Sequence, residues 1–154
     1  MDSTLVKELQ EFVDQHLNIV SSHLYESEEI IHDEIENFIK LTRKPSFIKV
    51  LFDFIDQKGS TDLEVYKKAR IDRRHFSKIR SNPDYRISKR TAISLAFALE
   101  LTKSDTETLL SAAGFSLSNH DTFDLVIQFC LEKALYNLDT VNEALDHFSL
   151  KPLA

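Results

Sequence analysis

Residues that punctuate or cross-link a chain are scarce in this sequence. Its 154 residues include two glycines, three prolines, one cysteine and no tryptophan. Glycine and proline supply the turns of many-stranded β proteins, so their scarcity excludes such a fold and favours an all-α one. A single cysteine cannot build a disulfide framework or a cysteine metal site. We therefore predict an all-α protein that resides in a reducing, cytoplasmic compartment.

Signals for membranes and for common enzyme sites are also missing. No apolar run reaches the length of a membrane span, and residues 1–24 mix apolar with acidic residues where a signal peptide would be basic and then apolar. Gly59 and Gly114 are isolated, so neither belongs to a glycine-rich phosphate loop. No Ser-His-Asp or paired-carboxylate signature stands out. We predict a protein that is not an enzyme, binds no cofactor and does not contact a membrane.

Two residue patterns could indicate a metal site or a catalytic cysteine. His32 lies one helical turn from Glu28 and from Glu36, a spacing that can place three metal ligands on one helix face. An exposed acidic helix produces that spacing by chance, and no second histidine follows at a ligand spacing, so we predict no metal site. Cys130 lies between Phe129 and Leu131, which favours an inert core thiol over a nucleophile.

The charges fall into three blocks along the chain. Residues 1–39 hold ten acidic and one basic residue, a net charge of −9. Residues 40–90 hold fifteen basic and six acidic residues, a net charge of +9, and residues 91–154 hold three and nine, a net charge of −6. A basic block creates a local positive field even on an acidic protein, and such a field attracts phosphates. The alternative is that the basic face pairs with the acidic N-terminal helices.

The centre of the basic block is typical of a helix-turn-helix. In TDLEVYKKARIDRRHFSKIRSN, residues 61–82, Thr61 and Glu64 have the spacing of a capping box, and Asp72 can cap a second helix. Phe76 and Ile79 then face inward. Their spacing leaves basic and polar side chains outward, as a recognition helix requires to reach base edges in a major groove: Arg73, Arg74, Ser77 and Lys78.

Residues 61–101 resemble the lambda-repressor-like helix-turn-helix family. In that family a loop and a helix rich in Leu and Ala follow the two-helix motif, matched here by IRSNPDYRISKRTAISLAFALEL. The family usually has glycine at the corner, where φ is positive, and this chain has Arg70. If the corner geometry is kept, Arg70 costs about 1 kcal/mol.

A longer resemblance covers residues 45–150. The phrases FIKVLFDFIDQKG, DLEVYKKARIDRRHFSKIRSNPDYRISKRTAISLAFALEL and FDLVIQFCLEKALYNLDTVNEAL are similar to an uncharacterised bacterial helical module that often follows another domain, such as a macro domain. That family carries no settled activity, so this resemblance implies a fold and not a partner.

Three segments follow from the helix patterns. Residues 1–42 predict an acidic pair of helices, one over residues 4–23 and one after Ser27. Residues 45–116 predict the helix-turn-helix core, with a further capping box at Ser104. Residues 119–150 predict a C-terminal pair packed on the core, whose last helix is capped by Thr140.

The function that we predict is a sequence-specific DNA-binding transcriptional regulator of bacterial or phage type. Base contacts are assigned to Arg73 and Arg74, with secondary contacts from Ser77 and Lys78. His75 touches DNA or solvent. Phosphate contacts are assigned to six further cations: Lys67, Lys68, Arg80, Arg86, Lys89 and Arg90.

Because one short helix reads few base pairs, we expect a homodimer on double-stranded DNA, formed through the N-terminal helices or the last two helices. The main alternative is a protein-interaction adaptor that regulates a partner enzyme or a defence system. A third possibility is that the acidic arm mimics DNA.

Overall fold

A computed structural model describes residues 2–153, and describes the side chains outside residues 17–27. It is all-α over that range. The chain divides into two units, residues 1–43 and residues 44–154. None of the described helices is long and apolar enough to cross a membrane.

The first unit is the helix α1, which spans Ser3–Thr42. Asp2 caps its start, where Oδ1 accepts a hydrogen bond from the Thr4 amide at 3.3 Å, and Arg43 ends it in an extended conformation. The pair of helices predicted for residues 1–42 is therefore one helix. The physical reason is that the first glycine or proline of the chain is Pro45, and Ser27 alone does not stop a helix whose neighbours are good helix formers.

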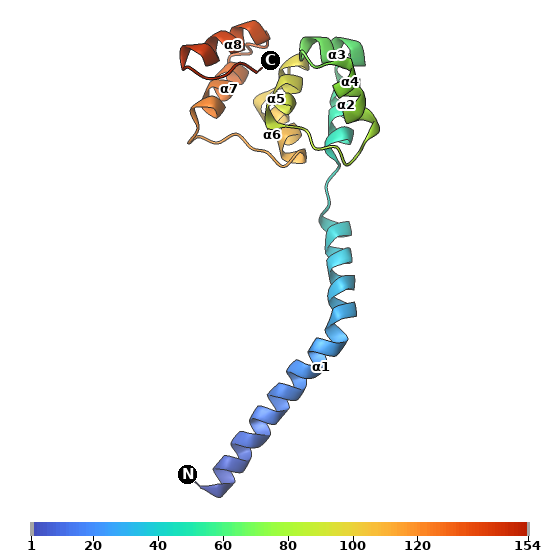
Figure 1. Cartoon of the computed structure of the whole chain (residues 1–154), viewed down its shortest axis with the longest axis vertical. Helices are drawn as coiled ribbons and strands as arrows, with labels where there is room; N and C mark the ends of the chain where they lie inside the picture. Colours follow the sequence, from blue (N-terminus) through green and yellow to red (C-terminus); the bar gives the residue numbers. More distant parts are fainter. Residues whose placement is uncertain (1, 154) are drawn as a thin grey trace. The chain divides into compact units, whose positions relative to one another are not determined.

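The second unit holds seven shorter helices, drawn in Figure 1: α2 Phe47–Gln57, α3 Asp62–Lys68, α4 Arg73–Ser81, α5 Lys89–Ala98, α6 Lys103–Ala112, α7 Thr122–Glu132 and α8 Leu138–His147. Among them α5 is central. Residues 92–99 are all buried, and α5 packs against both α3 and α6. The α7–α8 pair shares one hydrophobic core with the helices before it, so the segments predicted as core and C-terminal pair form one unit.

Side-chain caps fix where these helices begin. Thr61 Oγ1 accepts from the Glu64 amide at 3.2 Å and Asp72 Oδ1 from the Arg74 amide at 3.3 Å, as the sequence predicts. Two other predicted caps are wrong. Thr102 caps α6 in place of Ser104, and Asn137 caps α8 in place of Thr140. In both cases a capping residue two or three positions earlier starts the helix first.

Six helices of this unit end in the same way. The residue after the C-cap has positive φ, and the following amide donates to the carbonyl five residues back, which is the Schellman motif. Glycine occupies this position at Gly59 and Gly114 only; the other four residues are Arg70, Glu100, Ala134 and Ser149. Since a side chain strains a left-handed residue, four non-glycine ends are a local cost that packing of the helices offsets.

Candidate nucleic-acid interface

The corner between α3 and α4 brings the predicted base-reading residues into place. Arg70 has a φ of 56°, so the residue at the corner adopts the left-handed conformation although it carries a side chain. The Ile71 amide donates to the Tyr66 carbonyl at 2.9 Å and closes the turn. Buried Val65 and Ala69 fix α3 on the core below it, so the chain leaves the corner in a defined direction.

The next helix, α4, has one buried and one exposed face. Phe76 is 3% exposed and Ile79 is 1% exposed. The ring of Phe76 lies 5.5 Å from that of Tyr66 and 6.1 Å from that of Phe52, which anchors α4 to α3 and α2. The opposite face carries four exposed side chains, as the spacing predicts: Arg73, Arg74, Ser77 and Lys78.

The cations on this exposed face stand apart from the fold's own ion pairs. Arg73, Arg74 and Lys78 make no salt bridge or hydrogen bond through their side chains to any described residue. The same holds for Lys67, Lys68 and Arg86, which are exposed. These six side chains are therefore available to an anionic ligand.

Arg80 has partners inside the fold. Its guanidinium pairs with the Asp62 carboxylate at the start of α3, and it lies over the ring of Phe52, 5.0 Å from the centroid. The two contacts tie the end of α4 to α2 and α3. A phosphate contact by Arg80 remains a prediction, and it would compete with this structural role.

His75 is half-buried on α4. Its ring lies edge-on to that of Tyr85, with 5.6 Å between centroids, and Nε2 is buried without a hydrogen-bond partner among the described residues. The ring therefore supports the loop that follows α4. DNA contact by His75 remains a prediction.

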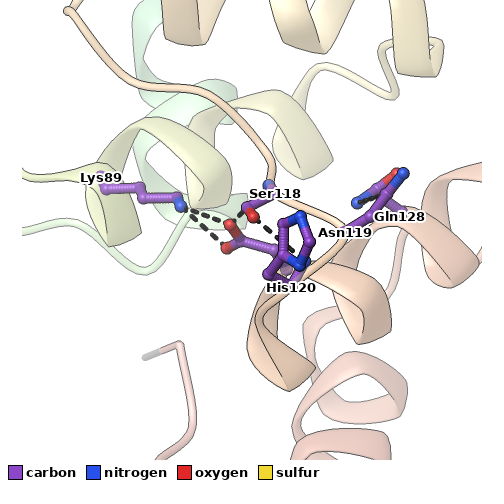
Figure 2. Close-up of polar contacts among 6 residues, drawn as sticks. Lys89, Ser118, Asn119, His120 and Gln128 are labelled. Carbon is purple, nitrogen blue, oxygen red and sulfur yellow. Dashed lines mark hydrogen bonds and ion pairs between the residues drawn. The ribbon is translucent and has the colours of Figure 1, made fainter.

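Lys89 holds a buried carboxylate (Figure 2). Its Nζ donates to Asp124 Oδ2 at 2.8 Å, and the same oxygen accepts the Ser118 amide at 2.8 Å. Oδ1 has only the ion-pair contact, also 2.8 Å from Nζ, and accepts no hydrogen bond of good geometry. The Asp124 side chain is 2% exposed. Lys89 thus joins α5 to α7 and the loop between α6 and α7, and we leave it out of the proposed phosphate contacts.

The loop before α7 extends the same network. The His120 amide donates to Ser118 Oγ at 3.1 Å, and Gln128 Nε2 donates to Asn119 Oδ1 at 3.1 Å (Figure 2). Together with the Asp124 contacts, these hydrogen bonds hold in place a loop that has no regular secondary structure. The network has a structural role, and its residues lie far in sequence from α4.

Arg90 is also engaged within the fold. Its Nη1 donates to the carbonyls of Lys151 and Pro152 at 3.2 and 2.9 Å, and its guanidinium lies 4.6 Å from the ring centroid of Phe123. Arg90 fastens the C-terminal segment to α5 and α7. We leave it out of the proposed phosphate contacts for the same reason as Lys89.

Arg70 has a partner that the sequence does not indicate. Arg70 Nη2 lies 2.5 Å from Asp139 Oδ1, which joins the α3–α4 corner to the first turn of α8. Beside this pair a cavity of about 440 Å³ is lined by Lys67 and Lys68 among others. The sequence does not indicate this contact, because residues 70 and 139 lie far apart in the chain and helical spacing relates only residues within a few turns.

The structure also describes Cys130 and the residues that could bind a metal. Cys130 is fully buried, and desolvation by burial raises the pKa of its thiol, which keeps it protonated and unreactive. Within the described part of the chain, no three His, Cys, Asp or Glu side chains gather as a metal would require.

Comparisons with family models, curated proteins and solved structures found no match for this chain.

Proposed function

We propose that this protein is a sequence-specific DNA-binding regulator whose second unit is a lambda-repressor-like helix-turn-helix with α4 as its recognition helix. The observation that carries the proposal is the exposed face of α4. There Arg73, Arg74 and Lys78 lack acidic partners among the described residues, while other cations of the basic block, such as Arg80 and Lys89, have them.

The position of the two arginines supports a functional reading. Arg73 and Arg74 occupy the first turn of α4, next to the positive end of the helix dipole, and that turn contains no acidic residue. Cations are unfavourable at a helix start, so these two residues do not stabilise α4. The N-terminal residues of a recognition helix are the ones that contact base edges, and arginine binds guanine through two hydrogen bonds.

The remaining contacts follow from exposure. We assign phosphate contacts to Lys67, Lys68 and Arg86 around the two arginines, with Ser77 and Lys78 as secondary contacts. Two copies on a two-fold operator would double the number of base pairs read, and we propose a homodimer.

A protein-interaction adaptor is the second candidate, and one observation favours it. An apolar groove of about 460 Å³ lies on the α7–α8 pair, lined by Leu125, Phe129, Phe148 and their neighbours. Leu125, Phe129 and Phe148 are 45%, 55% and 55% exposed. Grooves of this kind accept an apolar helix face of a partner protein.

A duplex titration separates the two candidates. The test variant replaces Arg73, Arg74 and Lys78 by Ala, and the control variant replaces Lys58, Lys133 and Lys151, which removes the same charge from elsewhere. We expect the test variant to lose at least about 30-fold in affinity for labelled duplex, because two arginine contacts worth about 1–3 kcal/mol each sum to at least about 2 kcal/mol. The control variant should stay close to the wild type. If the wild type and the test variant bind duplex equally, the proposal of a DNA-binding regulator is wrong and the adaptor proposal takes its place.

A further inference from the structure

The helix α1 carries two exposed apolar stripes. Large apolar side chains recur at three- and four-residue spacing near each end, and each is 41–67% exposed: Leu5, Val6, Leu9, Phe12 and Val13 in the first stripe, Ile31, Ile35, Phe38 and Ile39 in the second. Such spacing places the members of a stripe on one side of a helix, as in helices that pack against another helix.

We propose that the α1 helices of two copies of this chain pack against each other in antiparallel orientation. The first stripe of one copy then covers the second stripe of the other, and a two-fold axis passes through the middle of the pair. This contact goes beyond the proposed function, because it requires no DNA and holds equally for an adaptor.

The area of the two stripes is sufficient for a dimer. Burying one Leu or Ile side chain removes roughly 60–120 Å² of apolar surface, from its transfer free energy and the area coefficient. Nine side chains that are about half exposed in each copy therefore give roughly 500–1,000 Å² for the pair from apolar atoms alone. The flanking polar side chains of two 40-residue helices add to that. The sum reaches the roughly 1,000 Å² that a biological interface should exceed.

Charge decides the orientation. Residues 28–36 hold five acidic residues, and the basic residues Lys40, Arg43 and Lys44 follow them. In a parallel pair the acidic run of one copy would lie beside the acidic run of the other. The two basic ends would also lie side by side. In an antiparallel pair the basic end lies beside Asp2 of the other copy, and the acidic run faces a segment with fewer acids. Opposed helix dipoles favour the same arrangement.

Residual like charge predicts an unusual salt dependence. Residues 1–39 carry −9 in each copy, so the two helices still repel overall. Salt screens that repulsion, and the dimer should therefore tighten as salt rises. DNA binding has the opposite sign, because salt weakens phosphate contacts. The two effects can thus be separated in one protein.

The first test is the mass of the full chain in solution without DNA. At tens of micromolar we expect twice the 17.8 kDa of one chain, with a dissociation constant that falls at higher salt. The variant Leu9→Asp with Ile35→Asp should be monomeric with unchanged thermal unfolding of the second unit. The control Gln15→Asp, which adds charge off the stripes, should remain dimeric. A monomeric wild type, a trimer or larger assembly, or a Leu9→Asp/Ile35→Asp variant that stays dimeric would overturn the proposal.

The second test measures orientation. Leu41 is 88% exposed, and Cys130 is fully buried, so Leu41→Cys accepts a spin label selectively. In an antiparallel dimer the two labels lie roughly 50 Å apart, given a rise of about 1.5 Å per residue over most of α1. In a parallel dimer they lie within roughly 20 Å, because packed helix axes are only 8–10 Å apart. A short pulsed-resonance distance would refute the antiparallel pair.

Discussion

The ammonium group of Lys89 lies 2.8 Å from both carboxylate oxygens of Asp124, a residue 35 positions further along the chain. The pair closes the loop between α6 and α7 onto α5. Its carboxylate is almost fully buried, while the lysine side chain is 29% exposed. A pair of this kind is more sensitive to loss of one partner than to loss of both.

Lys89→Ala should lower the free energy of unfolding by about 3 kcal/mol, because the buried carboxyl group of Asp124 would lose its cationic partner. Asp124→Ala should cost about as much, since the Ser118 amide also loses its acceptor. The double variant should be less destabilised than the sum of the two by at least about 1 kcal/mol. Urea unfolding of all three measures this. Arg86→Ala, on an exposed cation, is the control and should stay within about 0.5 kcal/mol.

The left-handed helix ends predict two substitutions of opposite sign. Ala134 has a φ of 54° and is exposed, so Ala134→Gly should raise the free energy of unfolding by about 1 kcal/mol. Gly114 has a φ of 82°, and a Cβ there would meet no atom within 4 Å. Gly114→Ala should therefore lower stability by about 1 kcal/mol through backbone strain alone. A shift of the unfolding midpoint in the same direction for both substitutions would show that backbone strain does not set the stability at these positions.

Arg70 combines strain with an ion pair. Arg70→Gly relieves a left-handed arginine, worth about 1 kcal/mol, but it removes the pair with Asp139. Their side chains are 41% and 74% exposed, so the pair contributes at most about 1 kcal/mol. The net change should be small and stabilising. In an Asp139→Ala background the pair is already absent, and Arg70→Gly should then stabilise by the full amount. A loss of stability in that background would contradict the account.

Local chemistry explains why much of the fold was predictable. Thr61 and Asp72 sit directly before helical patterns, and Phe76 with Ile79 defines the buried face of α4 through spacing alone. Those signals involve residues within one or two turns, which the sequence displays directly. They suffice to orient Arg73 and Arg74 outward.

Contacts between distant residues account for what was missed. Nothing in the sequence near Lys89 or Arg90 indicates that Asp124 binds the one and the carbonyls of residues 151 and 152 bind the other. The sequence therefore predicts phosphate contacts for both. The predicted starts of α6 and α8 are wrong because each segment contains two residues that could cap the helix, and the earlier one does. The sequence predicts two helices where α1 is one, because Ser27 is a residue type that commonly caps a helix start, but here it lies inside the helix.

The central claim is that α4 reads a DNA sequence, and selection from a random duplex pool tests it most directly. The wild type and Arg74→Ala would be put through parallel selections, with Arg86→Ala as a matched loss of one exposed cation that we place on phosphate. We expect the wild type to enrich a defined site, Arg74→Ala to lose preference at one base pair of it, and Arg86→Ala to keep the full site with weaker binding. A wild type that enriches no sequence, or an Arg74→Ala profile identical to that of the wild type, would contradict the assignment of α4 as a recognition helix.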